Sequence, residues 1–194
     1  QSDILVFVWL LVVMYTTKFL DGLDGLATSV TSVGALMVML LSLTVVYFQP
    51  DVAILSAVTL GAFIGFLFWN VHPASIFLGE GGSTFVGYML GILAVISGGK
   101  LATALLVLGI PLLDVVWVIS RRWREGGFSR IFKGDKKHLH HRLLKLGWGQ
   151  THIVLLYVVI ASAFGLSALF LQSREKLVAL LILSVIMVLA ALLL

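Results

Sequence analysis

The sequence predicts an all-α membrane protein, a polytopic helix bundle with about seven transmembrane segments. Composition is the first reason, because 60% of the 194 residues are hydrophobic and 11% are charged, whereas soluble domains are about 25% charged. The second reason is that the apolar residues gather in long runs, with a mean hydropathy of +1.13. The chain has no cysteine, which excludes disulfides and thiolate metal ligands.

Seven apolar runs are the candidate segments, and we interpret residues 1–194 as one membrane domain. A bilayer core needs about 20 apolar residues per helix. The first and fourth runs have only 14 and 15 residues, so each is either a short span or a buried, re-entrant piece. The runs are Ile4–Thr17, Leu26–Phe48, Val52–Val71, Thr84–Gly98, Leu101–Ile119, Ile153–Leu171 and Leu177–Leu194.

The first run does not have the form of a signal peptide, because no basic segment precedes it and no small-residue cleavage site follows it. The chain starts on Gln1 rather than Met. We therefore expect the sequence to be an internal part of a longer protein.

With seven spans, the connections 18–25, 72–83 and 120–152 would lie on one side of the membrane. Together they carry ten of the 13 basic residues, nine of them in 120–152. The positive-inside rule makes this side cytoplasmic. The opposite connections, 49–51, 99–100 and 172–176, are short. Because the basic residues lie in loops between apolar runs, we expect anionic lipid or a phosphorylated substrate as partner, and not nucleic acid.

The stretch KFLDGLDGLA, residues 18–27, places two carboxylates at a boundary between apolar runs. Either Asp21 or Asp24 could cap the next helix, whose dipole stabilises negative charge by about 0.5 kcal/mol. Two acids, each followed by a glycine that allows close backbone approach, fit a cation or a phosphate–metal complex better. Capping remains the alternative. An EF-hand is excluded because its other acids are missing.

The second connection, NVHPASIFLGEGGSTF, sets Glu80 among glycines ahead of a helix. Gly-rich turns before a helix present backbone N–H groups to anions. An acid there would repel a bare phosphate, so a divalent cation between the acid and the phosphate is implied. Mg²⁺ fits this position, because it binds few protein carboxylates and completes its shell with water and phosphate oxygens. An ordinary turn with a solvated Glu80 is the alternative.

The third connection contains GDKKHLHHRLLKLGW, in which three histidines lie within four residues. Flanking cations disfavour a zinc site, so we interpret the histidines as hydrogen-bond donors to phosphate. Leu139, Leu143 and Leu146 share one helical face, which predicts a short amphipathic helix at the headgroup level. The cluster Arg121–Arg124 is explained by membrane orientation alone.

Asp114 lies within the fifth run, about 10 Å below the interface at about 1.5 Å per residue. Carboxylates inside a membrane are costly and are usually functional or paired within the bundle. A role near the cytoplasmic site and a structural hydrogen bond are both open.

These features together suit Mg²⁺-dependent transfer of a phosphorylated group from a water-soluble donor to a lipid. A small transporter fits the composition, but transporter sites usually lie near the midplane and not at one face.

Four ordered blocks, KFLDGLDGLA, FLFWNVHPASIFLGEGGSTFVGY, IPLLDVVWVISRR and FKGDKKHLHHRLLKLG, resemble those of the polyprenyl-phosphate N-acetylhexosamine-1-phosphate transferases. The resemblance covers most of the chain, from about Trp9 to about Leu171. The HLHHRLL form is similar to the WecA/TagO branch, which primes O-antigen, teichoic acid (cell wall) or other glycan chains, more than to the related MraY branch.

The resemblance implies transfer of a sugar 1-phosphate, typically N-acetylglucosamine 1-phosphate, from a UDP-sugar to undecaprenyl phosphate, with release of UMP. The membrane would be the bacterial cytoplasmic one, and a homodimer is open. Mg²⁺, or Mn²⁺, would be the cofactor. By analogy Asp21 and Asp24 are catalytic, Glu80 and Asp24 bind metal, and Asp114 supports the site. The implied substrate contacts are Lys18, Asn70, Gly81, Ser83, His138, His140, His141 and Arg142.

Three departures from the family pattern stand out. Lys18 replaces a common Asn, and Glu80 replaces the usual Asp. An adjacent Asp-Asp pair nearer the N-terminus has no counterpart, so roughly the first third of a family member is missing. A truncated or shortened relative that binds nucleotide sugar or lipid phosphate without turnover is therefore the alternative function.

Overall fold

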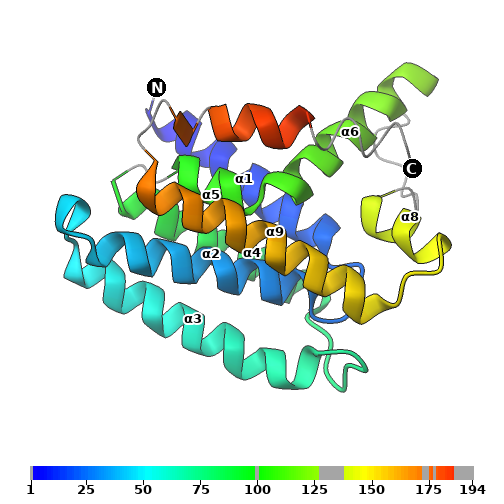
Figure 1. Cartoon of the computed structure of the whole chain (residues 1–194), viewed down its shortest axis with the longest axis horizontal. Helices are drawn as coiled ribbons and strands as arrows, with labels where there is room; N and C mark the ends of the chain where they lie inside the picture. The colour runs from blue at the N-terminus through cyan, green and yellow to red at the C-terminus, as the bar shows by residue number, and fades with distance from the viewer. Residues whose placement is uncertain (1, 99–100, 127–137, 172–174, 177, 186–194) are drawn as a thin grey trace.

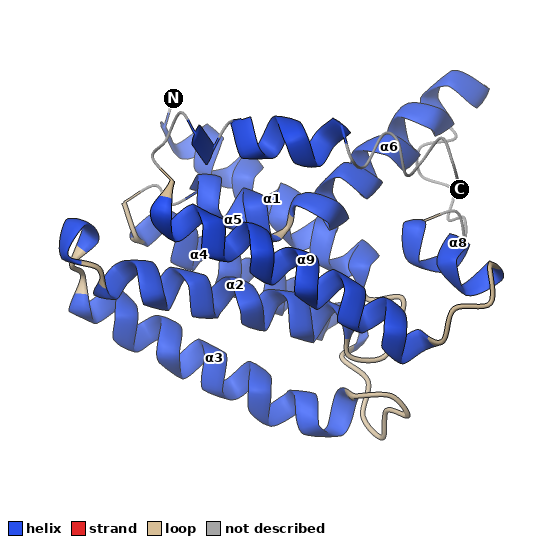
Figure 2. Cartoon of the chain, viewed as in Figure 1, coloured by secondary structure: helices blue, strands red, loops and turns tan. Residues whose placement is uncertain are grey.

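The computed structural model describes residues 2–98, 101–126, 138–171, 175–176 and 178–185, which contain helices and no strand. The predicted all-α fold is confirmed (Figures 1 and 2). Five helices are long and apolar enough to cross a membrane, or six if one bent pair is counted. The helices are α1 (Ser2–Leu20), α2 (Leu26–Leu43), η1 (Val45–Tyr47), α3 (Pro50–Asn70), α4 (Gly79–Ile96), α5 (Leu101–Val107), α6 (Gly109–Gly126), α8 (Leu139–Lys145) and α9 (Gln150–Phe170).

The two short apolar runs form helices of spanning length. Helix α1 has 19 residues and α4 has 18, because each helix continues into polar sequence beyond its apolar run. Lys18 therefore belongs to the last turn of α1, and Glu80 to the first turn of α4. By length and composition, both helices are therefore long enough to cross a membrane.

The fifth run, predicted as one span, is instead broken into α5 and α6, whose axes are bent by 76°. Proline explains the break, because Pro111 has no N–H to bond the carbonyl of Val107 and its ring crowds that carbonyl. Gly109 lies in the same segment, and a Cβ there would overlap Leu183 Cδ2. In the seventh run, residues 178–185 are helical, and 186–194 lie outside the described residues.

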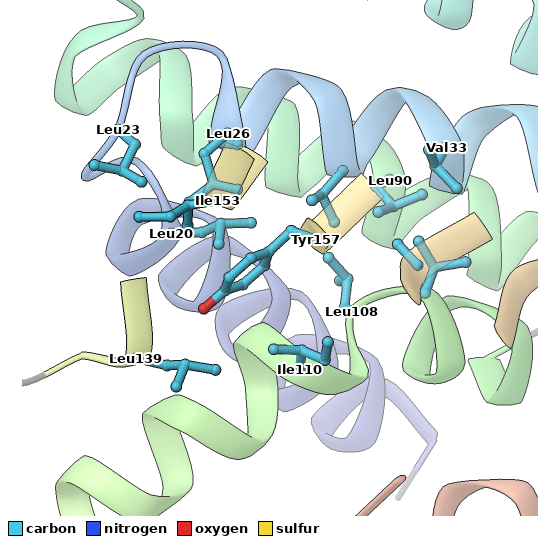
Figure 3. Close-up of a cluster of buried hydrophobic side chains, with 14 of the residues drawn as sticks. Leu20, Leu23, Leu26, Val33, Leu90, Leu108, Ile110, Leu139, Ile153 and Tyr157 are labelled. Carbon is cyan, nitrogen blue, oxygen red and sulfur yellow. The ribbon is translucent and has the colours of Figure 1, made fainter. Parts of the chain in front are cut away.

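Helix α2 is the centre of the bundle. In its 18-residue span 78% of the residues are buried, against 22% in α1, and it packs on α3, α4, α5 and α9. Tyr157 of α9 and Leu26 of α2 belong to the same cluster of buried apolar side chains (Figure 3). Two buried hydroxyls on α2 bond to its own backbone: Thr31 Oγ1 donates to the Ala27 carbonyl and Ser32 Oγ to the Thr28 carbonyl, each at 2.7 Å. Such bonds satisfy polar groups where lipid offers no partner.

The polar connections gather at one end of the bundle, as the alternation of spans predicts. Residues 21–25, residues 71–78 and α8 lie at the right-hand end of Figure 1, whereas 44–49 and the end of α4 lie at the other. Contacts between these segments, described below, confirm that they are neighbours.

Helices α1 and α4 approach each other closely because α4 carries glycines on the shared face. A Cβ at Gly87 would overlap Thr17 Oγ1 and lie 2.9 Å from Met14 Cα. Thr17 Oγ1 donates to the Ser83 carbonyl at 3.0 Å, and Trp9 Nε1 donates to the Gly91 carbonyl at 3.0 Å. This packing sets the register between the end of α1 and the start of α4.

We expect Gly87→Ala to destabilise the bundle by about 1–3 kcal/mol, the usual cost of overpacking, because the new methyl meets backbone atoms of α1. Thermal unfolding in detergent measures the change. Gly61→Ala is the control, since nothing lies within 4 Å of a Cβ there. Equal melting temperatures for the two variants would contradict the close contact.

Candidate active site

A pocket of about 280 Å³ opens at the polar end of the bundle. It joins the turn between α1 and α2 to the connection between α3 and α4, so the two segments singled out in the sequence form one concave site. Its lining residues are Asp21, Gly22, Leu23, Asp24, Asn70, Phe77, Leu78 and Gly79.

Asp21 is the half-buried carboxylate of this pocket. In the part of the chain that the structure describes, it has no hydrogen-bond or ion-pair partner. Desolvation by burial raises its pKa from 3.8 to about 6. Asp21 is therefore mostly ionised at neutral pH, but it lacks the compensation that a partly buried charge normally has.

Asp24 lies in the same turn and is compensated. Its Oδ2 is 2.8 Å from His72 Nδ1 and accepts the Ala74 N–H at 3.2 Å. The hydrogen bond from His72 is the main reason that the pKa of Asp24 is lowered, with the Ala74 amide contributing. The two acids of one motif thus have pKa values pushed apart by their surroundings, an arrangement typical of carboxylates with different chemical roles.

Asn70 closes the wall of the pocket at the end of α3. Its Oδ1 accepts from Thr28 Oγ1 at 2.9 Å and its Nδ2 donates to the Ile76 carbonyl at 3.0 Å. Asn70 was predicted to contact substrate, and both the oxygen and the nitrogen of its side-chain amide already form hydrogen bonds within the protein. Gly25 permits this packing, because its φ is 75° and a Cβ would lie 3.3 Å from the Asn70 carbonyl oxygen.

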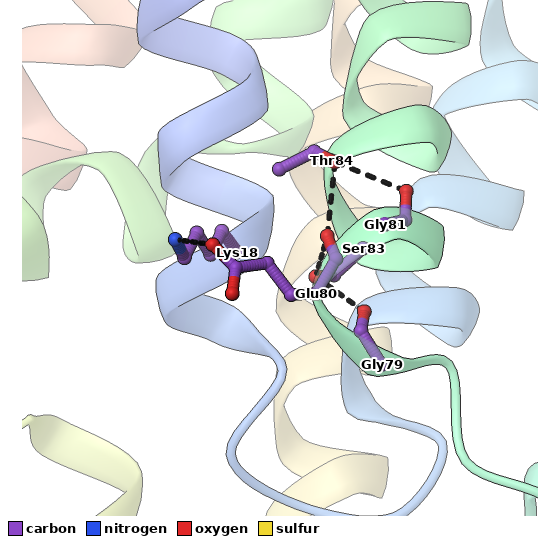
Figure 4. Close-up of polar contacts among 6 residues, drawn as sticks. All are labelled: Lys18, Gly79, Glu80, Gly81, Ser83 and Thr84. Carbon is purple, nitrogen blue, oxygen red and sulfur yellow. Dashed lines mark hydrogen bonds and ion pairs between the residues drawn. The ribbon is translucent and has the colours of Figure 1, made fainter.

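The start of α4 places Glu80 beside Lys18 of α1, and the two side chains form an ion pair (Figure 4). Ser83 is buried, and its Oγ donates to the Gly79 carbonyl at 2.9 Å. The Gly81 position is open, with nothing within 4 Å of a Cβ. Of the predicted contacts here, only Lys18, Glu80 and the Gly81 backbone face outward.

A short helix, α8, lies within 120–152, and its Leu139 and Leu143 are buried. Leu146 does not belong to the predicted stripe, because it follows the end of α8 and is exposed. Asp114 of α6 anchors the start of α8: Oδ2 is 2.8 Å from His138 Nδ1, and Oδ1 accepts the Leu139 N–H at 2.9 Å. Of the two roles that the sequence left open for Asp114, the structure therefore shows a buried hydrogen-bonding one. This contact fixes the position of the histidines.

The three histidines differ in environment. His138 stacks on Phe19 with ring centroids 5.7 Å apart, and His140 is 1% exposed. Burial, followed by the neighbouring His141 and His138, lowers the pKa of His140 to about 3, so its ring is neutral at physiological pH. His141 lies 4.3 Å from His140 between centroids. The next residue, Arg142, is half-buried in α8.

Gly22 joins the histidine helix to the carboxylate turn. A Cβ at Gly22 would overlap Nε2 of His140, so only glycine lets α8 lie against DGLDG. His72 is a site residue that the sequence reasoning missed, and its signal was a polar residue beside a proline in NVHPAS. The glycine after Asp21 was expected to allow a close approach, but the sequence did not show that His140 is the neighbour.

The structure also tests whether the site suits a divalent cation. Among the described residues, no group of three or more His, Asp or Glu side chains is placed to hold a metal ion. The pocket nevertheless offers two carboxylates, one of them uncompensated, and Mg²⁺ needs only one or two when substrate phosphates complete its shell. Glu80, by contrast, already has a cationic partner.

Comparison with known proteins agrees with this architecture. The model of Glycosyl transferase family 4 matches residues 2–98. A probable undecaprenyl-phosphate N-acetylglucosaminyl 1-phosphate transferase of Bacillus subtilis is 33% identical over 171 residues, which is 85% of this chain and 47% of that relative. The decaprenyl-phosphate N-acetylglucosaminephosphotransferase of Mycobacterium tuberculosis is 35% identical over 186 residues, covering 81% of the chain and 45% of the relative.

A phospho-N-acetylmuramoyl-pentapeptide-transferase of Rubrobacter xylanophilus is 34% identical over 155 residues, covering 75% of the chain and 43% of the relative. The fold is that of a polytopic membrane protein with two carboxylates in a pocket at one end of the bundle. The chain belongs to Glycosyl transferase family 4, and it spans about half the length of the relatives it matches.

We expect opposite effects of the same amide substitution on the two acids. Asp21→Asn should raise the melting temperature at pH 7.5, because the raised pKa of Asp21 means that its ionised form costs stability. The gain should shrink as the pH falls from about 6 to about 4. Asp24→Asn should lower the melting temperature at pH 7.5. The lowered pKa of Asp24 means that its ionised form stabilises the fold, and this stability is lost only on acidification. Shifts of the same sign would refute the assignment.

Asp114→Asn should loosen α8, because the carboxylate accepts from both His138 and the Leu139 amide. We expect faster hydrogen exchange for the α8 amides, by about tenfold for each 1.4 kcal/mol lost, with α2 unaffected. Asp51→Asn, at an exposed site on α3, is the control. Unchanged protection of α8 would show that Asp114 does not anchor it.

Proposed function

We propose that the protein transfers a sugar 1-phosphate, N-acetylglucosamine 1-phosphate, from a UDP-sugar to a polyprenyl phosphate such as undecaprenyl phosphate. UMP is released, and the reaction is the first step of a bacterial cell-envelope glycan. The observation that carries the proposal is the pocket with paired, differently compensated carboxylates, held against a histidine helix at one end of a membrane bundle. The basic residues of 120–152 support a cytoplasmic location for this end, in the bacterial inner membrane.

In this reaction an oxygen of the lipid phosphate attacks the β-phosphorus of the donor. The bond from that phosphorus to the bridging oxygen breaks, and the electron pair leaves with UMP. The second pKa of a phosphate monoester is about 6, so the lipid phosphate is largely ionised at neutral pH. No side chain is needed to remove a proton, and the protein's task is to position the two phosphates and offset their charge.

We assign the roles of this chain's residues from their placement. Asp21 and Asp24 would hold Mg²⁺ or Mn²⁺ in the pocket; the bound ion would offset negative charge on the diphosphate. Neutral His140 is held against Gly22, and His141 and Arg142 lie on the same short helix. The partly exposed His141 and Arg142 would bind donor phosphates by hydrogen bonds and charge, whereas the buried His140 would position this helix against the carboxylate turn.

Binding without turnover is the second candidate function. It is favoured by the Lys18–Glu80 ion pair, because an acid that is already paired with an ammonium is a poor metal ligand at the position where the resemblance places one.

UMP release by the purified chain in detergent, with UDP-N-acetylglucosamine, undecaprenyl phosphate and Mg²⁺, separates the two functions. We expect UMP that is lost with EDTA and reduced about 100-fold or more in Asp24→Asn, with Asp51→Asn as the control. Donor binding without UMP from a folded sample would establish the second function. Turnover that is unchanged in Asp24→Asn would overturn the role of the pocket.

A further inference from the structure

The Lys18–Glu80 ion pair stands out because both residues depart from the family pattern. Both lie at the polar end of the bundle, where α1 ends and α4 begins (Figure 4). Because the lysine and the carboxylate contact each other, we treat the two departures as one altered feature of the site.

The backbone fixes this contact. Thr17 precedes Lys18, and its Oγ1 donates to the carbonyl of Ser83, one turn from Glu80. Gly87 lets the helices approach at the same level. Lys18 therefore reaches Glu80 because of helix register, and the pair does not depend on a flexible loop.

Stability does not account for the pair. The side chains of Lys18 and Glu80 are 34% and 76% exposed, and exposed ion pairs contribute little to folding. The pair does change the net charge at Glu80, because the ammonium of Lys18 neutralises the carboxylate. A divalent cation at the same carboxylate would be repelled by Lys18.

We propose that the Lys18 ammonium is a built-in counter-ion that takes the place of a divalent cation at Glu80. The cation site is then confined to the pocket of Asp21 and Asp24, and an ammonium faces the diphosphate donor from the α1–α4 side. This inference rests on the proposed function for the pocket, but its central claim concerns Glu80 alone.

Binding of Mn²⁺ to the whole chain in detergent, followed by electron paramagnetic resonance, tests the claim without turnover. We expect the wild type and Glu80→Gln to bind Mn²⁺ with the same affinity. Lys18→Gln should bind about tenfold more tightly or gain a second site, because a repelling charge is removed from Glu80. Lys18→Gln/Glu80→Gln should return to the wild-type affinity.

Lys145→Gln, which removes an exposed charge from α8, controls for a general change in net charge. Loss of Mn²⁺ binding in Glu80→Gln, or no gain in Lys18→Gln, would overturn the inference. Asp24→Asn tests the pocket separately, because Mn²⁺ binding that survives this change contradicts the metal role of the pocket. A new, Glu80-dependent site in Lys18→Gln would support the inference even then.

Discussion

The carboxylate of Asp114 accepts hydrogen bonds from the ring of His138 and from the Leu139 amide, and the candidate site depends on those two contacts. They begin α8 against the bundle and direct His140 onto Gly22, so a residue of the bent α5–α6 segment determines what lies beside the DGLDG turn. Burying a carboxylate is costly unless it is hydrogen-bonded. Displacing α8 would leave the Asp114 carboxylate buried without its hydrogen-bond partners, which costs free energy. That cost favours this one position of α8.

The same principle separates the two acids of the turn. Asp24 has His72 and a backbone amide, whereas the Asp21 carboxylate is partly buried and has no partner among the residues that the structure describes. Both carboxylates line the pocket, and that of Asp24 also contacts the α3–α4 connection. The local sequence is the same at both acids, because each is followed by glycine. The tertiary surroundings of the two acids differ, so the difference between their pKa values arises from packing.

The sequence predicted the helical bundle, the single polar end and the short helix of the histidine loop, because these follow from hydropathy, the alternation of spans and a leucine stripe. It did not predict the bend at Pro111, because the run around it has the length of one span. The pairs Asp24–His72 and Lys18–Glu80 join residues 48 and 62 positions apart. Such pairs depend on the register between helices, which glycine contacts such as Gly87 set, and no local pattern encodes that register.

The charges of the site also constrain how it can accept anionic substrates. Lys18 compensates Glu80 and His72 contacts Asp24, which leaves Asp21 as the pocket carboxylate that still needs positive charge. A diphosphate and a lipid phosphate brought to this end would increase that need, since unpaired charges are costly away from bulk water. The burial that raises the pKa of Asp21 to about 6 favours any positive partner, a proton or a bound cation alike. A cation at Asp21 would therefore compete with a proton only near and below about pH 6, where the carboxyl begins to be protonated.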